Sequence, residues 1–135
     1  MTRCMKHDKK RRGIAMEMEK FVRQSILYDF YGELLTDHQK RIYEDIVFND
    51  MSYTEIANAE GISRQGVYDL IKRCDKILEE YEAKLKLVEK FQNTKGMVAK
   101  IEKLAKEMKE ANADAALVDK IEAVEKLSNS ILEEY

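Results

Sequence analysis

The stretch from Ser52 to Lys72 (SYTEIANAEGISRQGVYDLIK) most constrains the fold of this chain, because it predicts two short helices joined by a tight turn. Ser52 and Glu55 have the spacing of a capping box at a helix start. Gly61 supplies the residue with positive φ that ends this helix, and Ser63 caps a second one. The pattern is typical of a helix-turn-helix, whose second helix can lie in a DNA major groove.

The remainder of the chain is helical in pattern as well. Proline is absent, only 5 of the 135 residues are glycine, and 37% of the residues are charged, a composition typical of long helices. Apolar periodicity predicts a helix over 19–35. Thr36 and Gln39 predict a capping box at the start of the next helix. We therefore predict an all-α protein with a helix-turn-helix domain and further amphipathic helices towards the C-terminus.

The second helix of the motif is predicted to continue well beyond Lys72. Apolar residues recur at alternating spacings of four and three, as in a heptad seam: Val67, Ile71, Cys74, Leu78, Tyr81, Leu85 and Val88. A seam of this length needs an apolar partner. Either a second copy of the chain covers it, which would make the protein a homodimer, or the C-terminal helices fold back over it.

Three segments are expected along the chain. Residues 1–17 form a basic leader, which is disordered or is a misannotated start with Met16 or Met18 as the native first residue. Residues 18–92 form the helix-turn-helix domain with its extended helix. The run Asn93–Gly96 is expected to break the helix, and 93–135 then form a C-terminal helical hairpin that serves packing or dimerisation.

The surface available for recognition is the start of the second motif helix. Six side chains point away from the apolar seam: Arg64, Gln65, Tyr68, Asp69, Lys72 and Arg73. On a nucleic acid, Arg64 would reach guanine or a phosphate, Gln65 adenine, and Lys72 or Arg73 the backbone. The same side chains could anchor a protein partner, since Arg and Tyr are favoured at interfaces. They could also form an ordinary solvated helix face.

Charge bears on this choice. The chain has 24 basic and 26 acidic residues, a net charge of −2. The segment from Thr36 to Glu80 has six basic and ten acidic residues, so its net charge is −4. Phosphate neutralisation supplies most of the non-specific affinity of proteins for DNA. The acidic balance therefore favours a protein contact slightly over a DNA contact.

The sequence gives little support for catalysis, metal or cofactor binding, disulfide bonds or membrane insertion. The sequence has no glycine-rich phosphate loop, no Cys/His cluster and no nucleophile–base–acid set, so we expect a non-enzyme without metal or cofactor. Cys4 and Cys74 are too few for a disulfide framework. No apolar run reaches membrane-spanning length and no signal peptide is visible, so a cytoplasmic location without membrane insertion is expected.

The run from Leu35 to Leu85, and above all SRQGVYDLIKR followed by KILEEYEAKL, resembles the YlxM family of small bacterial helix-turn-helix proteins. More loosely, MSYTEIANAEGIS is similar to the DNA-reading region four of sigma factors. The YlxM resemblance implies an all-helical, dimeric regulator of the signal recognition particle pathway, in contact with the targeting GTPase or its RNA. Gly66 stands where that family commonly has Ala. Glu60 stands where it commonly has an aromatic residue, and is expected to weaken packing beside the turn.

Two alternatives to this regulatory function remain open. The first is a transcriptional regulator that reads duplex DNA through Arg64, Gln65, Tyr68 and Lys72. The second is a purely structural interaction protein, in which the helix-turn-helix is only a packing unit.

Overall fold

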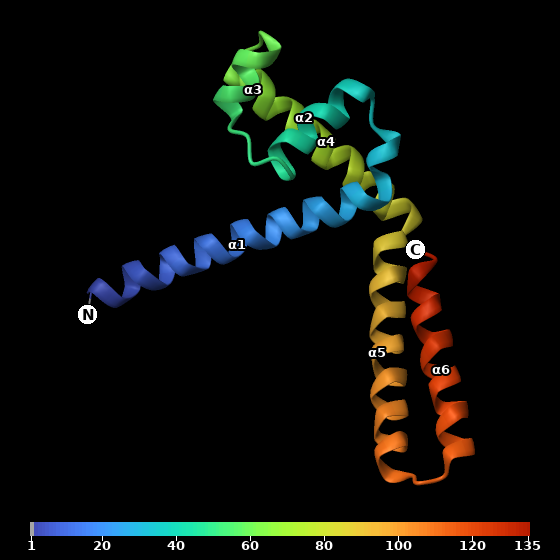
Figure 1. The fold of residues 1–135 in the computed structure, drawn as a ribbon. Coiled ribbons are helices and arrows are strands. Elements are labelled where there is room, and N and C mark those ends of the chain that lie inside the picture. The colour runs from blue at the N-terminus through green and yellow to red at the C-terminus, as the bar shows by residue number, and fades with distance from the viewer. Residues whose placement is uncertain (1) are drawn as a thin grey trace. The chain divides into compact units, whose positions relative to one another are not determined.

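The protein folds as two helical units. The computed structural model describes the backbone of residues 2–135 and the side chains of residues 16–135. Its elements, in chain order, are α1 (Thr2–Tyr31), the 3₁₀ helix η1 (Gly32–Leu34), α2 (Asp37–Val47), α3 (Tyr53–Glu60), α4 (Arg64–Leu85), α5 (Leu87–Ala111) and α6 (Ala115–Glu133) (Figure 1). No residue in this described part lies in a strand, so the predicted all-α class is confirmed. Residues 1–86 form one compact unit and residues 87–135 form the second.

The helix ends of the first unit follow the capping pattern in the sequence. The hydroxyl of Thr36 accepts a hydrogen bond from the Gln39 N–H at 3.2 Å, and the Gln39 side chain accepts one from the Thr36 N–H at 3.0 Å. Ser52 and Glu55 form the same reciprocal pair at the start of α3. Gly61 ends α3 with φ 68°, the left-handed conformation that favours glycine. These predicted caps are confirmed.

The core of the first unit lies between α4 and the three helices that precede it. Helices α1, α2 and α3 each pack against α4. The buried apolar side chains of α4 are Val67, Ile71, Cys74 and Leu78, and those contributed by the preceding segments are Leu27, Tyr31, Leu35, Ile42, Tyr43, Ile56 and Ala57. The first four positions of the predicted seam are therefore covered within the chain.

The predicted continuation of α4 through Val88 is wrong. The helix ends at Leu85, because Lys86 adopts φ 53°, a left-handed conformation that does not continue an α-helix. Tyr81 still belongs to the packed face, where its ring stacks on that of Tyr31 with centroids 6.0 Å apart. Leu85 is 47% exposed, whereas Val88 is buried but lies in α5, in the second unit.

The second unit is an antiparallel hairpin of α5 and α6 (Figure 1). The expected break at Asn93–Gly96 lies inside α5, as does the expected boundary between residues 92 and 93. Packing of the helix along α6 offsets the cost of a glycine in a helix interior, which is about 1 kcal/mol. Asp114 caps α6 by accepting the Ala116 N–H at 3.0 Å. The buried residues of the hairpin are Val88, Val98, Ala105, Ile121 and Ser128.

Helix α1 begins earlier than the helix predicted over 19–35. Its backbone is helical from Thr2, through the segment expected to form a leader. The side chains of residues 1–15, including the basic cluster at 9–12, lie outside the described part of the structure. A native start at Met16 or Met18 stays a prediction.

Candidate partner-binding site on the helix-turn-helix

The helix-turn-helix presents one face of α4 to solvent. Ser63 fixes the start of α4, since its hydroxyl accepts the Gly66 N–H at 3.0 Å. Ala57 is buried, and its small side chain lets α3 and α4 approach closely. The predicted contact residues all lie exposed on α4: Arg64, Gln65, Tyr68, Asp69, Lys72 and Arg73. The structure therefore brings together on one helix face the six residues that the sequence singled out.

Neighbouring side chains orient one another on this face. The amide of Gln65 donates a hydrogen bond to Asp69 at 3.0 Å. The ammonium of Lys72 lies 4.8 Å from the centre of the Tyr68 ring, a cation–π distance. A hydrogen bond with the adjacent Tyr68 raises the pKa of Lys72, so its ammonium stays charged to a higher pH than that of an ordinary lysine. The face thus combines fixed positive charge with an aromatic ring.

An additional aromatic residue, Tyr53, belongs to this site and was not among the predicted residues. Its ring meets the edge of the Tyr68 ring, with centroids 6.0 Å apart. Tyr53, Arg64, Gln65 and Tyr68 line a shallow hollow where the first turns of α3 and α4 meet. Sequence spacing could not indicate this contact, because the two tyrosines lie on different helices.

The charge of the exposed face differs from the charge of the segment that carries it. Seven of the ten carboxylates between Thr36 and Glu80 accept a hydrogen bond: Glu44 from Tyr28, Asp45 from Asn49, Glu55 from the Ser52 N–H, Glu60 from Arg41, Asp69 from Gln65, Asp75 from Gln24 and Tyr43, and Glu79 from Arg23. Between residues 64 and 73, three cations stand against the single carboxylate of Asp69. Among the described side chains, Arg64 and Arg73 form no ion pair. The exposed face is therefore positively charged.

Glu60 stabilises the turn region, contrary to the expectation that it weakens packing there. Its carboxylate accepts two hydrogen bonds from the Arg41 guanidinium, at 3.2 and 3.0 Å. His38 lies 3.9 Å from the same carboxylate. A bidentate ion pair with α2 takes the place of an aromatic contact, and ties the end of α3 to the neighbouring helix.

Polar contacts also fix α4 against α1 and α2. Arg23 of α1 donates two hydrogen bonds to Glu79, both at 3.0 Å. Gln24 donates to Asp75 at 2.9 Å, and the Tyr43 hydroxyl donates to the same carboxylate at 2.7 Å. Burial and the Asp75 carboxylate together raise the pKa of Tyr43. The exposed face of α4 is thus carried on a helix that is held by both core packing and polar contacts.

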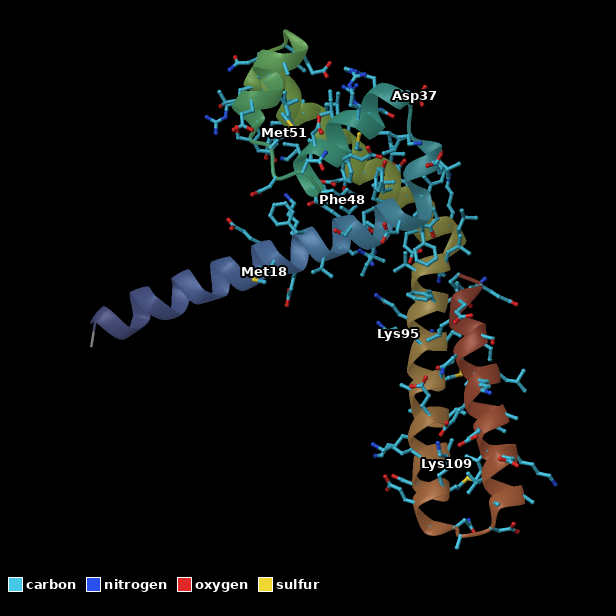
Figure 2. The ribbon with its side chains drawn as sticks, in the orientation of Figure 1. Met18, Asp37, Phe48, Met51, Lys95 and Lys109 are labelled. Carbon is cyan, nitrogen blue, oxygen red and sulfur yellow. The ribbon has the colours of Figure 1, made fainter. Side chains whose placement is uncertain are left out.

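The end of α2 is held by aromatic contacts with α1. Tyr28 of α1 stacks on Tyr43 and meets Phe48 edge to face, with centroids 5.6 and 5.3 Å apart. Figure 2 shows Phe48 beside α1. The Tyr28 hydroxyl also donates a hydrogen bond to Glu44. These contacts fix α2, and α2 in turn packs against α4.

The groups that could carry reactive chemistry are few in the described part of the chain. Burial raises the pKa of the Cys74 thiol to about 11, so it stays protonated and is a poor nucleophile at neutral pH. No three His, Cys, Asp or Glu side chains among residues 16–135 lie close enough to hold a metal ion. None of the described helices is both long and apolar enough to span a bilayer.

Comparisons with known proteins agree with this architecture. Residues 18–118 match the family described as helix-turn-helix protein, YlxM / p13 like (UPF0122). A UPF0122 protein of Bacillus velezensis and the UPF0122 protein YlxM of Bacillus subtilis are each 46% identical over 112 residues, which is 83% of this chain and 99% of the relative. A UPF0122 protein of Bacillus cereus is 44% identical over 110 residues, 82% of this chain and 98% of the relative. The chain belongs to the YlxM/p13-like family of bacterial helix-turn-helix proteins.

Proposed function

We propose that this protein is a non-enzymatic, cytoplasmic regulator of the signal recognition particle pathway, acting by contact with the targeting GTPase or its RNA. The resemblance to the YlxM family supports the pathway. The positively charged face of α4 carries the proposal, and favours the RNA as the component that is bound. The local charge supports an anionic partner: residues 64–73 have three cations and one carboxylate, although the longer segment from Thr36 to Glu80 has a net charge of −4.

The chemistry of the face suits a folded RNA. Arg64 and Arg73 have guanidinium groups free to bind phosphates or guanine edges. Tyr68 and Tyr53 offer aromatic surface beside the hollow, and aromatic rings stack on unpaired bases of RNA loops. Lys72, held over the Tyr68 ring, adds a charge that contributes to affinity without selecting a base.

Duplex DNA is the second candidate partner, and the helix-turn-helix geometry favours it. The N-terminal residues of a second motif helix usually face base edges in the major groove. Arg64 and Gln65 occupy these positions in α4, and the hydrogen bond from Gln65 to Asp69 holds the amide in a defined orientation. Lys72 and Arg73 follow about two helical turns later, where backbone phosphates would lie.

Binding measured as a function of salt separates these candidates. We would titrate fluorescent signal recognition particle RNA, a mixed-sequence DNA duplex and the purified targeting GTPase with the full-length protein. If RNA is the partner, its affinity exceeds that of the duplex and falls steeply with salt. Arg64→Ala and Arg73→Ala should each lower the slope of log K against log salt by about 1. Lys95→Ala, a charge change on the hairpin, serves as the matched control.

The remaining outcomes are equally informative. Salt-insensitive binding to the GTPase, lost in Arg64→Ala and Tyr68→Ala, would support the same pathway through a protein contact. A stronger, salt-dependent affinity for the duplex would favour the transcriptional regulator. If both substitutions leave every interaction unchanged, the face has no binding role and the structural interaction protein is the surviving alternative.

A further inference from the structure

The hollow at the start of α4 has the size and the lining of a site for one nucleotide. Its volume is about 510 Å³, within the range of about 300–1,000 Å³ that is typical of small-molecule sites. Two aromatic rings and two nitrogen-bearing side chains line it: Tyr53, Tyr68, Arg64 and Gln65. Each of these side chains is at least partly exposed, so a ligand can reach all four.

The two rings form a corner in which a planar group can stack. The Tyr53 and Tyr68 rings are nearly perpendicular, at 85°, with centroids 6.0 Å apart. A base placed in this corner stacks on one ring and meets the other with its edge, and aromatic groups favour both arrangements. The ammonium of Lys72, 4.8 Å from the centre of the Tyr68 ring, helps to hold that ring in place. A flat aromatic ligand therefore fits the hollow better than a branched aliphatic one.

The polar side chains of the hollow present donors on one group and an acceptor on the other. The Arg64 guanidinium offers only donors, arranged as a planar fork, and forms no ion pair among the described side chains. The amide nitrogen of Gln65 donates to Asp69 at 3.0 Å. Because an ionised carboxylate can only accept, this contact fixes which end of the amide faces Asp69. It leaves the Gln65 Oε1 atom to accept from a ligand.

Guanine is the RNA base that matches this pattern on both sides. Its neighbouring acceptors, N7 and O6, are the atoms that an arginine fork binds bidentately. Its neighbouring donors, N1–H and N2–H, can share a single carbonyl oxygen. Adenine has no neighbouring pair of acceptors, and cytosine has such a pair but only one donor group. In a duplex, N1 and N2 of guanine are paired and its faces are stacked, so only an unpaired guanine offers both edges and a ring face.

We propose that this hollow binds one unpaired guanine of the RNA. The base stacks in the corner between the two tyrosines, while Arg64 donates to N7 and O6 and Gln65 accepts from N1–H and N2–H. Asp69 is a positioning residue, because it acts through the orientation of the Gln65 amide. This assignment rests on the proposed function, since RNA is the partner that supplies the base, and it adds which base is selected and by which atoms.

Short single-stranded RNA tests the site whichever RNA is the natural partner. We would titrate a fluorescein-labelled uridylate hexamer that carries one central guanosine with the full-length protein, and compare it with the hexamer that carries adenosine there. The bidentate contact predicts about tenfold tighter binding of guanosine. Two analogues examine each edge separately. The 7-deazaguanosine base lacks the N7 acceptor and inosine lacks the N2 amino group, so each should lose affinity severalfold.

Substitutions in the hollow assign the contacts to residues. Tyr53→Ala should weaken binding of the guanosine hexamer about tenfold through lost stacking, whereas Tyr53→Phe should retain it. Tyr135→Ala removes an exposed tyrosine from the second unit and is the matched control. Arg64→Lys keeps the charge but removes the fork, so the difference between guanosine and 7-deazaguanosine should shrink to about twofold. Helical circular dichroism verifies that each variant is folded.

Asp69→Ala separates positioning from simple charge. Loss of a carboxylate beside the RNA should raise the affinity for both hexamers severalfold. The Gln65 amide would then rotate freely, so the ratio of guanosine to adenosine affinity should fall to about one half or less. A higher affinity with an unchanged ratio would show that Asp69 acts only through its charge.

A free guanine nucleotide is the other possible source of this base. Unlabelled 5′-GMP should displace the guanosine hexamer only at about a hundredfold higher concentration, because it lacks the neighbouring phosphates that Lys72 and Arg73 would contact. Displacement by 5′-GMP at a concentration equal to that of the hexamer would assign the hollow to a nucleotide instead of an RNA.

Three results would overturn the guanine site: no binding of any hexamer, equal affinity for guanosine and adenosine, or binding that Tyr53→Ala and Arg64→Lys leave unchanged. The proposed function would survive these results if signal recognition particle RNA still bound with a salt slope that Arg64→Ala and Arg73→Ala reduce. Conversely, guanosine-selective binding of the hexamer without affinity for that RNA would support the site and reject the pathway.

Discussion

Asp75 joins three helices of the first unit through one carboxylate. It lies on α4 and accepts hydrogen bonds from Gln24 of α1 at 2.9 Å and from Tyr43 of α2 at 2.7 Å. Both donors are buried, so each would leave an unsatisfied polar group if the carboxylate were removed. The contact therefore helps to define how α1 and α2 are placed against α4, the helix that carries the candidate site.

Removal of the Tyr43 hydroxyl measures this contact. Tyr43→Phe keeps the buried ring and deletes one charged hydrogen bond, while Asp75 retains its contact with Gln24. We expect the free energy of unfolding to fall by about 1–2 kcal/mol in urea denaturation. Tyr53→Phe is the control, because Tyr53 is partly exposed and its ring contact with Tyr68 survives; it should change stability by less than about 0.5 kcal/mol. Equal effects of the two substitutions would contradict a specific role for the Asp75 contact.

Single residues could be predicted from the sequence where their interactions are local. The caps at Thr36 and Ser52 link residues three apart, so the pattern alone identifies them. The contacts of Asp75 link residues 51 and 32 apart, and that of Glu60 with Arg41 links residues 19 apart. The spacing of apolar residues along the sequence cannot indicate such pairs, because the two residues lie on different helices. For this reason Glu60 looked unfavourable in the sequence although it forms an ion pair in the fold.

At the scale of the element, the junction between α4 and α5 is the feature that the sequence pattern did not predict, because the helix break was expected at Asn93–Gly96. Lys86 adopts a left-handed conformation, which non-glycine residues occupy at a cost of about 1 kcal/mol. Asn93–Gly96, with the stronger helix-breaking composition, stays helical because α5 packs along α6. Intrinsic propensities differ by about 1 kcal/mol at most among these residues, and tertiary packing outweighs them.

Lys86→Gly should stabilise the protein, because glycine adopts the positive φ without steric strain. The gain is reduced by the greater freedom of glycine in the unfolded chain, so we expect an increase of about 0.5 kcal/mol in the free energy of unfolding. Lys86→Ala is the matched control, since alanine removes the charge but keeps the Cβ atom that causes the strain. Stabilisation by alanine as large as that by glycine would show that the lysine charge, not the backbone, is responsible.

For the whole molecule, the distribution of charge matters more than its sum. The sequence identified the six exposed residues of the α4 face, because helical periodicity separates them from Val67 and Ile71. It could not show that five of the ten carboxylates of the same segment contact α1, α2 or a helix start instead. It also could not place Tyr53 in the site. Both facts depend on how the helices pack, and they turn an unfavourable net charge into a positively charged face.

The same packing predicts how the stability of the protein depends on pH. Burial raises the pKa of Cys74 from its ordinary value of 9.0 to about 11, and the pKa values of Tyr28 and Tyr43 are raised above 10.0. In this range the folded state holds protons that the unfolded chain has released, so the free energy of unfolding falls as pH rises. The contribution of Cys74 is fully present below pH 9 and is lost between pH 9 and about 11.

Urea denaturation at several pH values from 8 to 11 measures this dependence. We expect the free energy of unfolding to fall by about 2–3 kcal/mol from Cys74 alone, because one pKa unit corresponds to 1.36 kcal/mol, with a further loss from the tyrosines. Lysines that titrate near the same pH contribute equally to wild type and variants, so the comparison between them isolates the thiol. Cys74→Ala lowers stability at pH 8 through the lost packing but should flatten the alkaline decline. If Cys74→Ala and the wild type decline with the same slope, the buried thiol is not the group that limits stability at high pH.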